Sequence, residues 1–232
     1  MAANLSGHVL GIYSFNLILY RFKKTVIIPI INTMSNDWID NIISAWTGHR
    51  KFAEWLVQTV KPTTIVELGV DYGFSTFVFG NALQGSSGTI YGIDLFQGDI
   101  HTGFRDTSSN VTDKITEHNL TNIKIIKGEF TEVSKTWSTP IDILHIDGLH
   151  TFEAVKTDFL TWAPFVKNSG IILFHDITAF AEIQHFFRIL SGGRKLYFTH
   201  SAGLGILTQN EELANLIVST FNNVNDFTVT PL

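Results

Sequence analysis

The sequence predicts an α/β protein whose seven-stranded sheet is mostly parallel, doubly wound and completed by a C-terminal antiparallel hairpin. Short apolar runs alternate with stretches of helical periodicity, which is typical of parallel strands joined by helices. The runs are nearly continuously apolar, as expected of strands buried on both faces. With 232 residues, 44% of them apolar and 19 of them Phe, the chain can bury one compact core without disulfides or a structural metal.

The expected elements follow one another in regular order from residue 35 onward. Five runs are predicted to be the parallel strands: Thr64–Leu68, Thr89–Ile93, Ile123–Ile126, Ile141–Ile146 and Ile171–Phe174. Two more runs, Lys195–Thr199 and Gly205–Thr208, are separated by a short Ser-Ala-Gly connection and form the predicted hairpin. Helical spacing of apolar residues predicts helices over Asp37–Trp46, Arg50–Val60, Ser75–Leu83, Val111–Asn119, Phe152–Phe165, Ala179–Leu190 and Glu211–Phe221.

The chain divides by composition into an apolar N-terminal segment (1–34), a helical cap (35–61), the sheet-forming core (62–208) and a C-terminal helix and tail (209–232). Residues 1–20 carry no charged side chain, and Arg21–Lys24 follow them. A signal peptide has its positive charges before the apolar run. We therefore favour a cytoplasmic protein whose first segment packs on the domain or on a partner, over a membrane anchor or a linker from a longer polypeptide.

Composition also excludes several classes of function. The chain has no Cys, which rules out disulfide frameworks, Cys-ligated zinc, iron–sulfur clusters and thiol nucleophiles. The net charge of −5, without a block of Lys or Arg, argues against a nucleic-acid partner, since phosphate binding relies on such side chains.

The turn after the first strand, Glu67-Leu-Gly-Val-Asp-Tyr-Gly73, is the most informative loop. Gly69 and Gly73 let the backbone turn tightly and approach a ligand. Three alternatives are open: a plain turn, a nicotinamide-dinucleotide site, and a site for S-adenosylmethionine. A dinucleotide site requires G-x-G-x-x-G, but Val70 stands where the second Gly belongs. Glu67 and Asp71, in or beside the turn, disfavour the pyrophosphate of a dinucleotide and suit the cationic sulfonium of S-adenosylmethionine.

The ends of the next two strands carry further acids. Asp94, after the second strand, is placed to accept the ribose hydroxyls, as an acid does in dinucleotide-binding folds. Glu129, after the third strand, is suited to hydrogen bonding at an adenine edge. Phe96 could stack on the adenine ring.

The runs VELGVDYGFST, GID, KGEF and IDILHIDGLHTFEAVKTDFLTWAPFVKNSGIILFHD together resemble class I S-adenosylmethionine-dependent methyltransferases, which have a Rossmann-like fold. The fourth strand ends D-G-x-H and the fifth H-D, which is similar to a group that includes O-methyltransferases of sugars. The resemblance implies methyl transfer to a hydroxyl of a sugar or glycan. Alternatives are a small phenolic or other natural product as acceptor, or a nicotinamide-dependent oxidoreductase. The resemblance also implies that the protein forms a homodimer or is part of a longer chain that includes a glycosyltransferase.

By position, the resemblance implies specific roles at the cofactor. Glu67, Gly69 and Gly73 would line the methionine end of S-adenosylmethionine, and Ser75 would bind its carboxylate. Asp94 would bind the ribose and Glu129 the adenine side. Asp147 would lie beside the sulfonium and the acceptor.

Asp147, His150, His175 and Asp176 follow the fourth and fifth strands, so they should converge over the methyl group. A hydroxyl acceptor needs either a general base or a divalent ion that lowers its pKa. We expect His150 to be the base, with capping of the helix after Thr151 as the alternative, and Asp147 and His175 to act with it. In related metal-dependent enzymes the ligands are acids. Asp147 and Asp176 match this pattern, whereas His175 departs from it. The resemblance therefore implies that Asp147, His175 and Asp176 hold Mg²⁺ or Mn²⁺, or that no metal is bound.

The remaining polar and aromatic candidates are assigned less specific roles. The loop 97–110 is expected to be either a lid or a disordered surface loop, with His101, Arg105 and Asp106 available to sugar hydroxyls. His145 lies inside a strand and is expected to be a packed core residue. His185 and His200 are expected at the surface or in the hairpin, and Trp38, Trp46 and Phe52 in the core.

Overall fold

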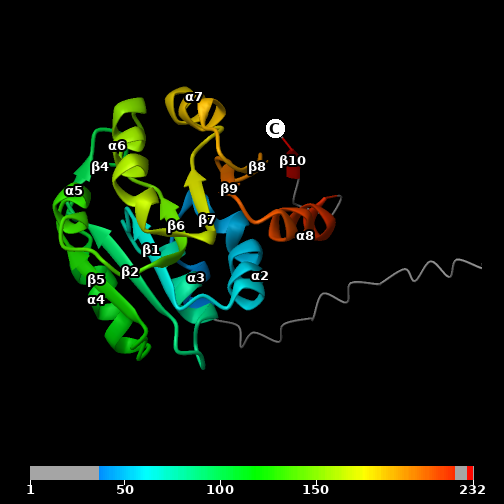
Figure 1. Cartoon of the computed structure of the whole chain (residues 1–232). Helices are drawn as coiled ribbons and strands as arrows, with labels where there is room; N and C mark the ends of the chain where they lie inside the picture. The colour runs from blue at the N-terminus through cyan, green and yellow to red at the C-terminus, as the bar shows by residue number, and fades with distance from the viewer. Residues whose placement is uncertain (1–36, 223–228, 232) are drawn as a thin grey trace, which may run out of the picture. The chain divides into compact units, whose positions relative to one another are not determined.

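The computed structural model describes residues 37–222 and 229–231, and the predicted N-terminal segment 1–34 lies outside them. Its centre is an eight-stranded sheet with the strand order β10-β8-β9-β7-β6-β1-β2-β5 (Figure 1). Neighbours from β5 to β7 are parallel, whereas β9 runs antiparallel to both β7 and β8. The predicted doubly wound α/β fold with a C-terminal hairpin is therefore confirmed.

The strands lie close to the predicted runs. The main sheet contains β1 (Thr64–Leu68), β2 (Thr89–Asp94), β5 (Ile123–Lys127), β6 (Ile141–Ile146), β7 (Val166–His175), β8 (Arg194–Phe198), β9 (Leu204–Thr208) and β10 (Val229–Pro231). A separate two-stranded hairpin is made by β3 (Gly98–Asp99) and β4 (Gly103–Phe104).

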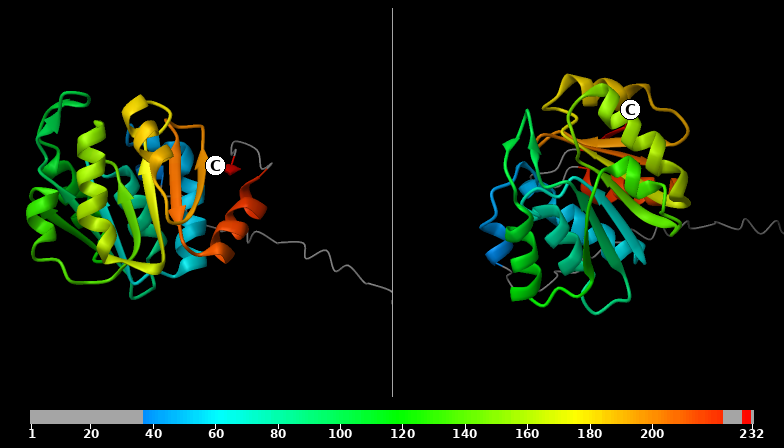
Figure 2. Two further views of the ribbon diagram at one scale, coloured as in Figure 1. Left: turned by 45° about the horizontal axis from the view of Figure 1, so that its top comes forward. Right: turned by 90° about the vertical axis from the view of Figure 1, so that its left-hand side faces the viewer.

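Helices cover both faces of the sheet (Figure 2). They are α1 (Asp37–Asp40), α2 (Arg50–Val60), α3 (Phe74–Ala82), α4 (Ser108–Glu117), α5 (Phe130–Ser134), α6 (Phe152–Trp162), α7 (Ala181–Ile189) and α8 (Glu211–Phe221), with 3₁₀ turns η1 (Ala45–His49) and η2 (Ala163–Phe165). No helix in the described part of the chain is long and apolar enough to cross a bilayer.

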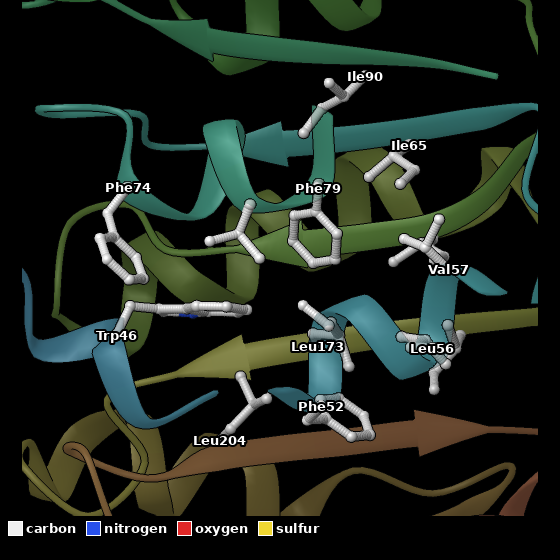
Figure 3. Packing of buried hydrophobic residues seen from close by; sticks show 14 of the residues in the cluster. Trp46, Phe52, Leu56, Val57, Ile65, Phe74, Phe79, Ile90, Leu173 and Leu204 are labelled. Atoms are coloured by element: carbon white, nitrogen blue, oxygen red, sulfur yellow. The ribbon is translucent and has the colours of Figure 1, made fainter. Parts of the chain in front are cut away.

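Alternate residues of each strand enter two separate cores, because successive side chains point to opposite faces of a sheet. One core joins the sheet to α2, α3 and α8, and includes Trp46, Phe52 and Phe79 (Figure 3). The other joins it to α6 and α7, through Trp162, Phe186 and others. The predicted helical cap 35–61 thus packs into the same core as the sheet, and the expected burial of Trp46 and Phe52 is confirmed.

Local sequence explains where several helices begin and end. Thr151 and Asn210 accept hydrogen bonds from backbone N–H groups in the first turns of α6 and α8. Lys61 ends α2 in a left-handed conformation with φ of +50°, directly before Pro62, which cannot continue a helix.

Several details differ from the sequence prediction, including an unpredicted short helix α5 and a β7 that begins at Val166 rather than at Ile171. The helix predicted over Asp37–Trp46 is replaced by α1 and η1, since Ser44 caps a new turn by accepting a hydrogen bond from the Trp46 backbone. The loop 97–110 is ordered as the β3–β4 hairpin and the start of α4, so the expectation of a disordered surface loop is wrong. The helix predicted from Val111 begins at Ser108, and β10 adds an unpredicted edge strand to β8.

Candidate active site

A cavity of about 610 Å³ opens at the carboxyl ends of β1, β2, β5, β6 and β7. Ligands in open α/β sheets bind at this edge. Every predicted cofactor residue except Glu67 lines it: Gly69, Gly73, Ser75, Asp94, Phe96, Glu129 and Asp147. The predicted His150, His175 and Asp176 line it as well, so the structure brings these predicted residues together around one cavity.

The glycine loop brings two strand ends into direct contact. Gly69 has a φ of +93°, and a Cβ built there would lie 2.1 Å from the carbonyl oxygen of Asp147. Gly73 has a φ of +84°, and its Cβ would meet the ring of Phe77 at 2.7 Å. Both positions therefore require Gly for conformation and for space.

Helix α3 begins immediately after this loop and turns its first residues toward the cavity. Gly73 is the N-cap and supplies no side-chain acceptor. The first backbone N–H groups of a helix lack partners within the helix. Together with the Ser75 side chain, which is buried and lines the cavity, they suit the carboxylate of an amino acid.

Asp94 is held by the backbone around it. Its Oδ2 accepts hydrogen bonds from the N–H groups of Val70 (2.7 Å) and Asp71 (3.0 Å), and its Oδ1 accepts one from Phe96 (2.7 Å). A carboxylate offers about four acceptor positions. One position is left for a ligand hydroxyl, so the structure favours a single bond to a ribose rather than the predicted pair.

The β3–β4 hairpin is tied to the glycine loop. Arg105 donates two hydrogen bonds to Asp71, at 2.8 and 2.7 Å, and Thr107 donates one to the Asp71 carbonyl at 2.7 Å. Asp106 instead pairs with Ser108 and Lys127 at the surface. Neither Arg105 nor Asp106 lines the cavity. Their predicted contacts with sugar hydroxyls are therefore not supported by the structure.

Glu67 is fully buried and lies beneath the cavity without lining it, which corrects its predicted place at the cofactor. Its carboxylate accepts hydrogen bonds from Thr76 and from Nδ1 of His145 (2.9 Å). His145 Nε2 in turn accepts one from the indole N–H of Trp46 (3.1 Å). Because the indole N–H can only donate, Nε2 of His145 accepts, and Nδ1 is the nitrogen that faces Glu67. These bonds satisfy the Glu67 carboxyl inside the core and confirm His145 as a packed core residue.

Two further acids, Glu129 and Asp158, line another part of the cavity. Glu129 is the N-cap residue of α5, and Asp158 on α6 faces the same space. Burial and the nearby charge of Glu129 raise the pKa of Asp158 to about 7. Asp158 was missed by the sequence analysis, since an acid within an amphipathic helix gives no local sign of lining a cavity.

Asp147, His175 and Asp176 form a compact acid–histidine centre. Nδ1 of His175 lies 3.2 Å from both Asp147 Oδ1 and Asp176 Oδ2. Nε2 of His175 donates a hydrogen bond to the carbonyl of Ser201 (3.1 Å). Asp176 has a φ of +63°, a conformation that is costly outside Gly and that clusters at functional sites.

The charges in this centre compensate one another. Burial disfavours a charged imidazole, but Asp147 and Asp176 outweigh it and raise the pKa of His175 to about 10. Burial likewise opposes ionisation of Asp147, yet His175 and His150 hold the pKa of that carboxyl far below its ordinary value. Without a metal ion, the centre therefore consists of carboxylates neutralised by imidazolium groups.

His150 completes the centre from the loop after β6. Its Nε2 lies 2.7 Å from Asp176 Oδ2, and its ring stacks on Phe180 at 4.3 Å. Burial lowers its pKa, but the bonds to Asp147 and Asp176 dominate and raise the pKa to about 9. The alternative that His150 caps the following helix is wrong, because the Thr151 hydroxyl performs that role.

The donor set of the acid–histidine centre fits a divalent ion. One ligand atom from each of Asp147, His175 and Asp176 lies within 4.8 Å of the others. The bond from His175 Nε2–H to Ser201 fixes the tautomer that presents Nδ1, the way metal-binding histidines are commonly oriented. Two carboxylates and one imidazole suit Mg²⁺ or Mn²⁺.

The cavity as a whole is strongly acidic. Seven carboxyl groups line it, and no Lys or Arg is found among its described lining residues; the acids are Asp71, Asp94, Asp99, Glu129, Asp147, Asp158 and Asp176. Such a lining favours cationic or neutral, hydroxyl-rich ligands and disfavours phosphates. His185 lies at the surface as predicted, and His200 stays outside the cavity in the β8–β9 connection.

Comparison with known proteins assigns the fold. Residues 66–177 match the family model described as "Methyltransferase domain". An uncharacterized protein of Sinorhizobium fredii, y4gI, is 34% identical over 181 residues, which cover 74% of this chain. The chain spans only about a fifth (20%) of that curated relative's length.

Solved O-methyltransferases share the architecture at low sequence identity. TomG from Streptomyces achromogenes, solved with S-adenosylmethionine, superimposes with a TM-score of 0.56 at 13% identity, over 72% of this chain and 82% of that one. An O-methyltransferase from Bacillus cereus, solved with S-adenosylhomocysteine, gives a TM-score of 0.55 at 15% identity, with the same coverage of 72% and 82%.

Proposed function

We propose that this chain, whose residues 66–177 match a methyltransferase domain, is a class I S-adenosylmethionine-dependent methyltransferase that transfers a methyl group to a hydroxyl of a sugar or glycan. The observation that carries the proposal is the acidic cavity, in which the glycine loop lies against the acid–histidine centre. This lining supports a sulfonium cofactor bound beside groups that can orient and deprotonate a hydroxyl.

The chain's own residues supply the cofactor site. The start of α3 and Ser75 bind the methionine carboxylate, and Asp94 accepts a ribose hydroxyl. Phe96 and Glu129 take the adenine, with Asp158 added by the structure. The backbone of Asp147, in contact with Gly69, borders the methyl group.

His150 is the proposed base, and its charge state decides when it can act. With a pKa of about 9, His150 is protonated at neutral pH as long as the charges of Asp147 and Asp176 act on it and are not shared with an ion. A divalent ion held by Asp147, His175 and Asp176 would lower the pKa of the acceptor hydroxyl and draw on the same carboxylates. With those carboxylates engaged by an ion, His150 would lose the partners that retain its proton and would be able to accept the proton of the hydroxyl.

The cofactor assignment is tested by titration calorimetry with S-adenosylhomocysteine. We expect binding by the wild type and at least about tenfold weaker binding by Asp94→Ala, because the substitution removes both a ligand acceptor and the anchor of the glycine loop. Asp113→Ala, at an exposed position of α4, is the matched control and should bind as the wild type does. Binding of NADH in place of S-adenosylhomocysteine would refute the assignment.

The metal assignment is tested by activity after exhaustive treatment with EDTA. We expect activity to be lost and then restored by Mg²⁺ or Mn²⁺. Asp176→Asn should raise the concentration of metal required for restoration. Undiminished activity in EDTA would show that His150 acts without an ion.

A phenolic or other natural product is the second candidate acceptor, and an apolar rim around the cavity favours it. Ile43, Tyr72 and Leu149 line the cavity, and Ile100 and Phe104 stand on the hairpin beside it. All five are exposed; Ile43 reaches 95%. Labelled S-adenosylmethionine assayed against free oligosaccharides, nucleotide sugars, phenols and glycosides with an apolar group would separate the candidates. We expect nucleotide sugars to fail, because the acidic lining repels phosphates.

We propose that this chain corresponds to a methyltransferase module that works beside other domains, of which a glycosyltransferase is the one we expect. The greater length of the relative from Sinorhizobium fredii, of which the match covers 20%, supports this proposal. Homodimer formation stays a prediction, and sedimentation of the purified chain would test it.

A further inference from the structure

The hairpin β3–β4 carries two members of a second group of potential metal ligands, which adjoins the acid–histidine centre through His150. Asp99, His101 and His150 each offer one ligand atom, and these atoms lie within 4.8 Å of one another. Asp99 and His101 belong to the hairpin, whereas His150 follows β6 on the opposite side of the cavity. The group therefore bridges the hairpin and the body of the domain.

The local bonds leave these side chains available. Asp99 uses only Oδ1 to hold the hairpin turn, accepting hydrogen bonds from the backbone of His101 and Thr102, both at 2.7 Å. Both ring nitrogens of His150 are buried and form no hydrogen bond in the described part of the chain, although Nε2 lies 2.7 Å from Asp176 Oδ2. The His150 side chain is only 10% exposed. A buried imidazole without hydrogen bonds, beside a second imidazole and a carboxylate, calls for an explanation, and a bound metal ion supplies one.

We propose that Asp99, His101 and His150 bind a transition-metal ion of the Zn²⁺ class, which fastens the hairpin over the cavity. Two imidazoles and one carboxylate are a ligand set that Zn²⁺ accepts, with a remaining position for water. Zn²⁺ can also bind the acid–histidine centre, because two carboxylates and one imidazole are Zn²⁺ ligands too. The assignment of the second site therefore rests on Asp99 and His101, which do not belong to that centre.

The site is tested by calorimetric titration of the full chain with Zn²⁺, in which variants at Asp99 and His101 distinguish this site from the acid–histidine centre. We expect Zn²⁺ binding by the wild type, and affinity lower by about tenfold or more in Asp99→Asn and in His101→Ala, since even losing a group that only orients a ligand costs about 10- to 100-fold. His185→Ala removes an exposed histidine outside the cluster and should leave the affinity unchanged.

Amide hydrogen exchange gives a second readout that is independent of catalysis. Zn²⁺ should slow exchange over residues 98–104 in the wild type and leave it unchanged in His101→Ala. No Zn²⁺ binding by the wild type, or equal affinity in Asp99→Asn, His101→Ala and the wild type, would overturn the proposed site. Zn²⁺ binding with normal exchange would overturn its role in closing the cavity.

Discussion

Gly69 and Asp147 stand 78 residues apart in the sequence, yet the backbone of one leaves no room for a side chain beside the other. This contact holds the turn after β1 against the end of β6, where the cofactor loop meets the acid–histidine centre. A substitution at Gly69 would therefore affect both stability and ligand binding.

Gly69→Ala and Gly85→Ala form a matched pair, because both positions have positive φ, +93° and +78°. A Cβ at Gly85 would meet nothing within 4 Å. We expect Gly85→Ala to lower the free energy of unfolding by about 1 kcal/mol through backbone strain alone. Gly69→Ala should cost about 1–3 kcal/mol more, because its Cβ also collides with a carbonyl. Urea unfolding of both variants measures the difference, and equal losses would disprove the clash.

At the scale of elements, the β3–β4 hairpin and the glycine loop are joined by Arg105 and Asp71. The pair lies at the surface, where the Arg105 and Asp71 side chains are 28% and 49% exposed. Surface ion pairs contribute about 0–1 kcal/mol to stability. Its position between two cavity walls suggests that it matters more for the shape of the site than for folding.

Arg105→Gln should separate these two effects. We expect the free energy of unfolding to fall by less than about 1 kcal/mol. The dissociation constant for S-adenosylhomocysteine should rise roughly three- to tenfold, equivalent to about 1 kcal/mol, because the hairpin is released from the glycine loop. Arg194→Gln breaks a similar surface pair with Glu211 and should leave binding unchanged. If Arg105→Gln binds as tightly as the wild type, the hairpin does not hold the loop in place.

At the scale of the whole molecule, buried ionisable groups couple the site to global stability. His150 and His175 have pKa values raised from 6.5 to about 9 and about 10. Both are charged in the folded and unfolded protein below pH 6.5, so their full contribution is present there. Above pH 6.5 the unfolded chain loses these protons first, and the contribution disappears as pH rises through the folded values.

We therefore expect the metal-free protein to lose stability between pH 7 and pH 9. The loss should be at most about 1.4 kcal/mol per pH unit for each histidine. His150→Gln should reduce the slope, whereas His185→Gln, at an exposed position, should not. Denaturant unfolding in EDTA across this range measures it. A flat profile in the wild type would mean that these imidazoles are neutral in the folded state.

The sequence by itself determined the elements of the sheet and most of the cavity. Buried parallel strands are recognisable in the sequence as apolar runs, and the residues after each run lie at the same edge of the sheet. For this reason Asp94, Asp147 and Asp176 could be placed together without a structure. Helix ends were less certain, because caps such as Ser44 and Thr151 act through local bonds that compete with periodicity.

Only the tertiary structure decided which acids face the cavity and which lie beneath it. Glu67 lies in β1 and Asp94 ends β2, but Glu67 is satisfied by His145 and Thr76 inside the core, whereas backbone N–H groups hold Asp94 at the cavity.

Arg105 binds Asp71 and does not itself line the cavity, whereas Asp158 and Asp99 line the cavity from other elements. The direction of a side chain depends on partners that are distant in the sequence, and the order of residues along the chain does not show which of them come into contact.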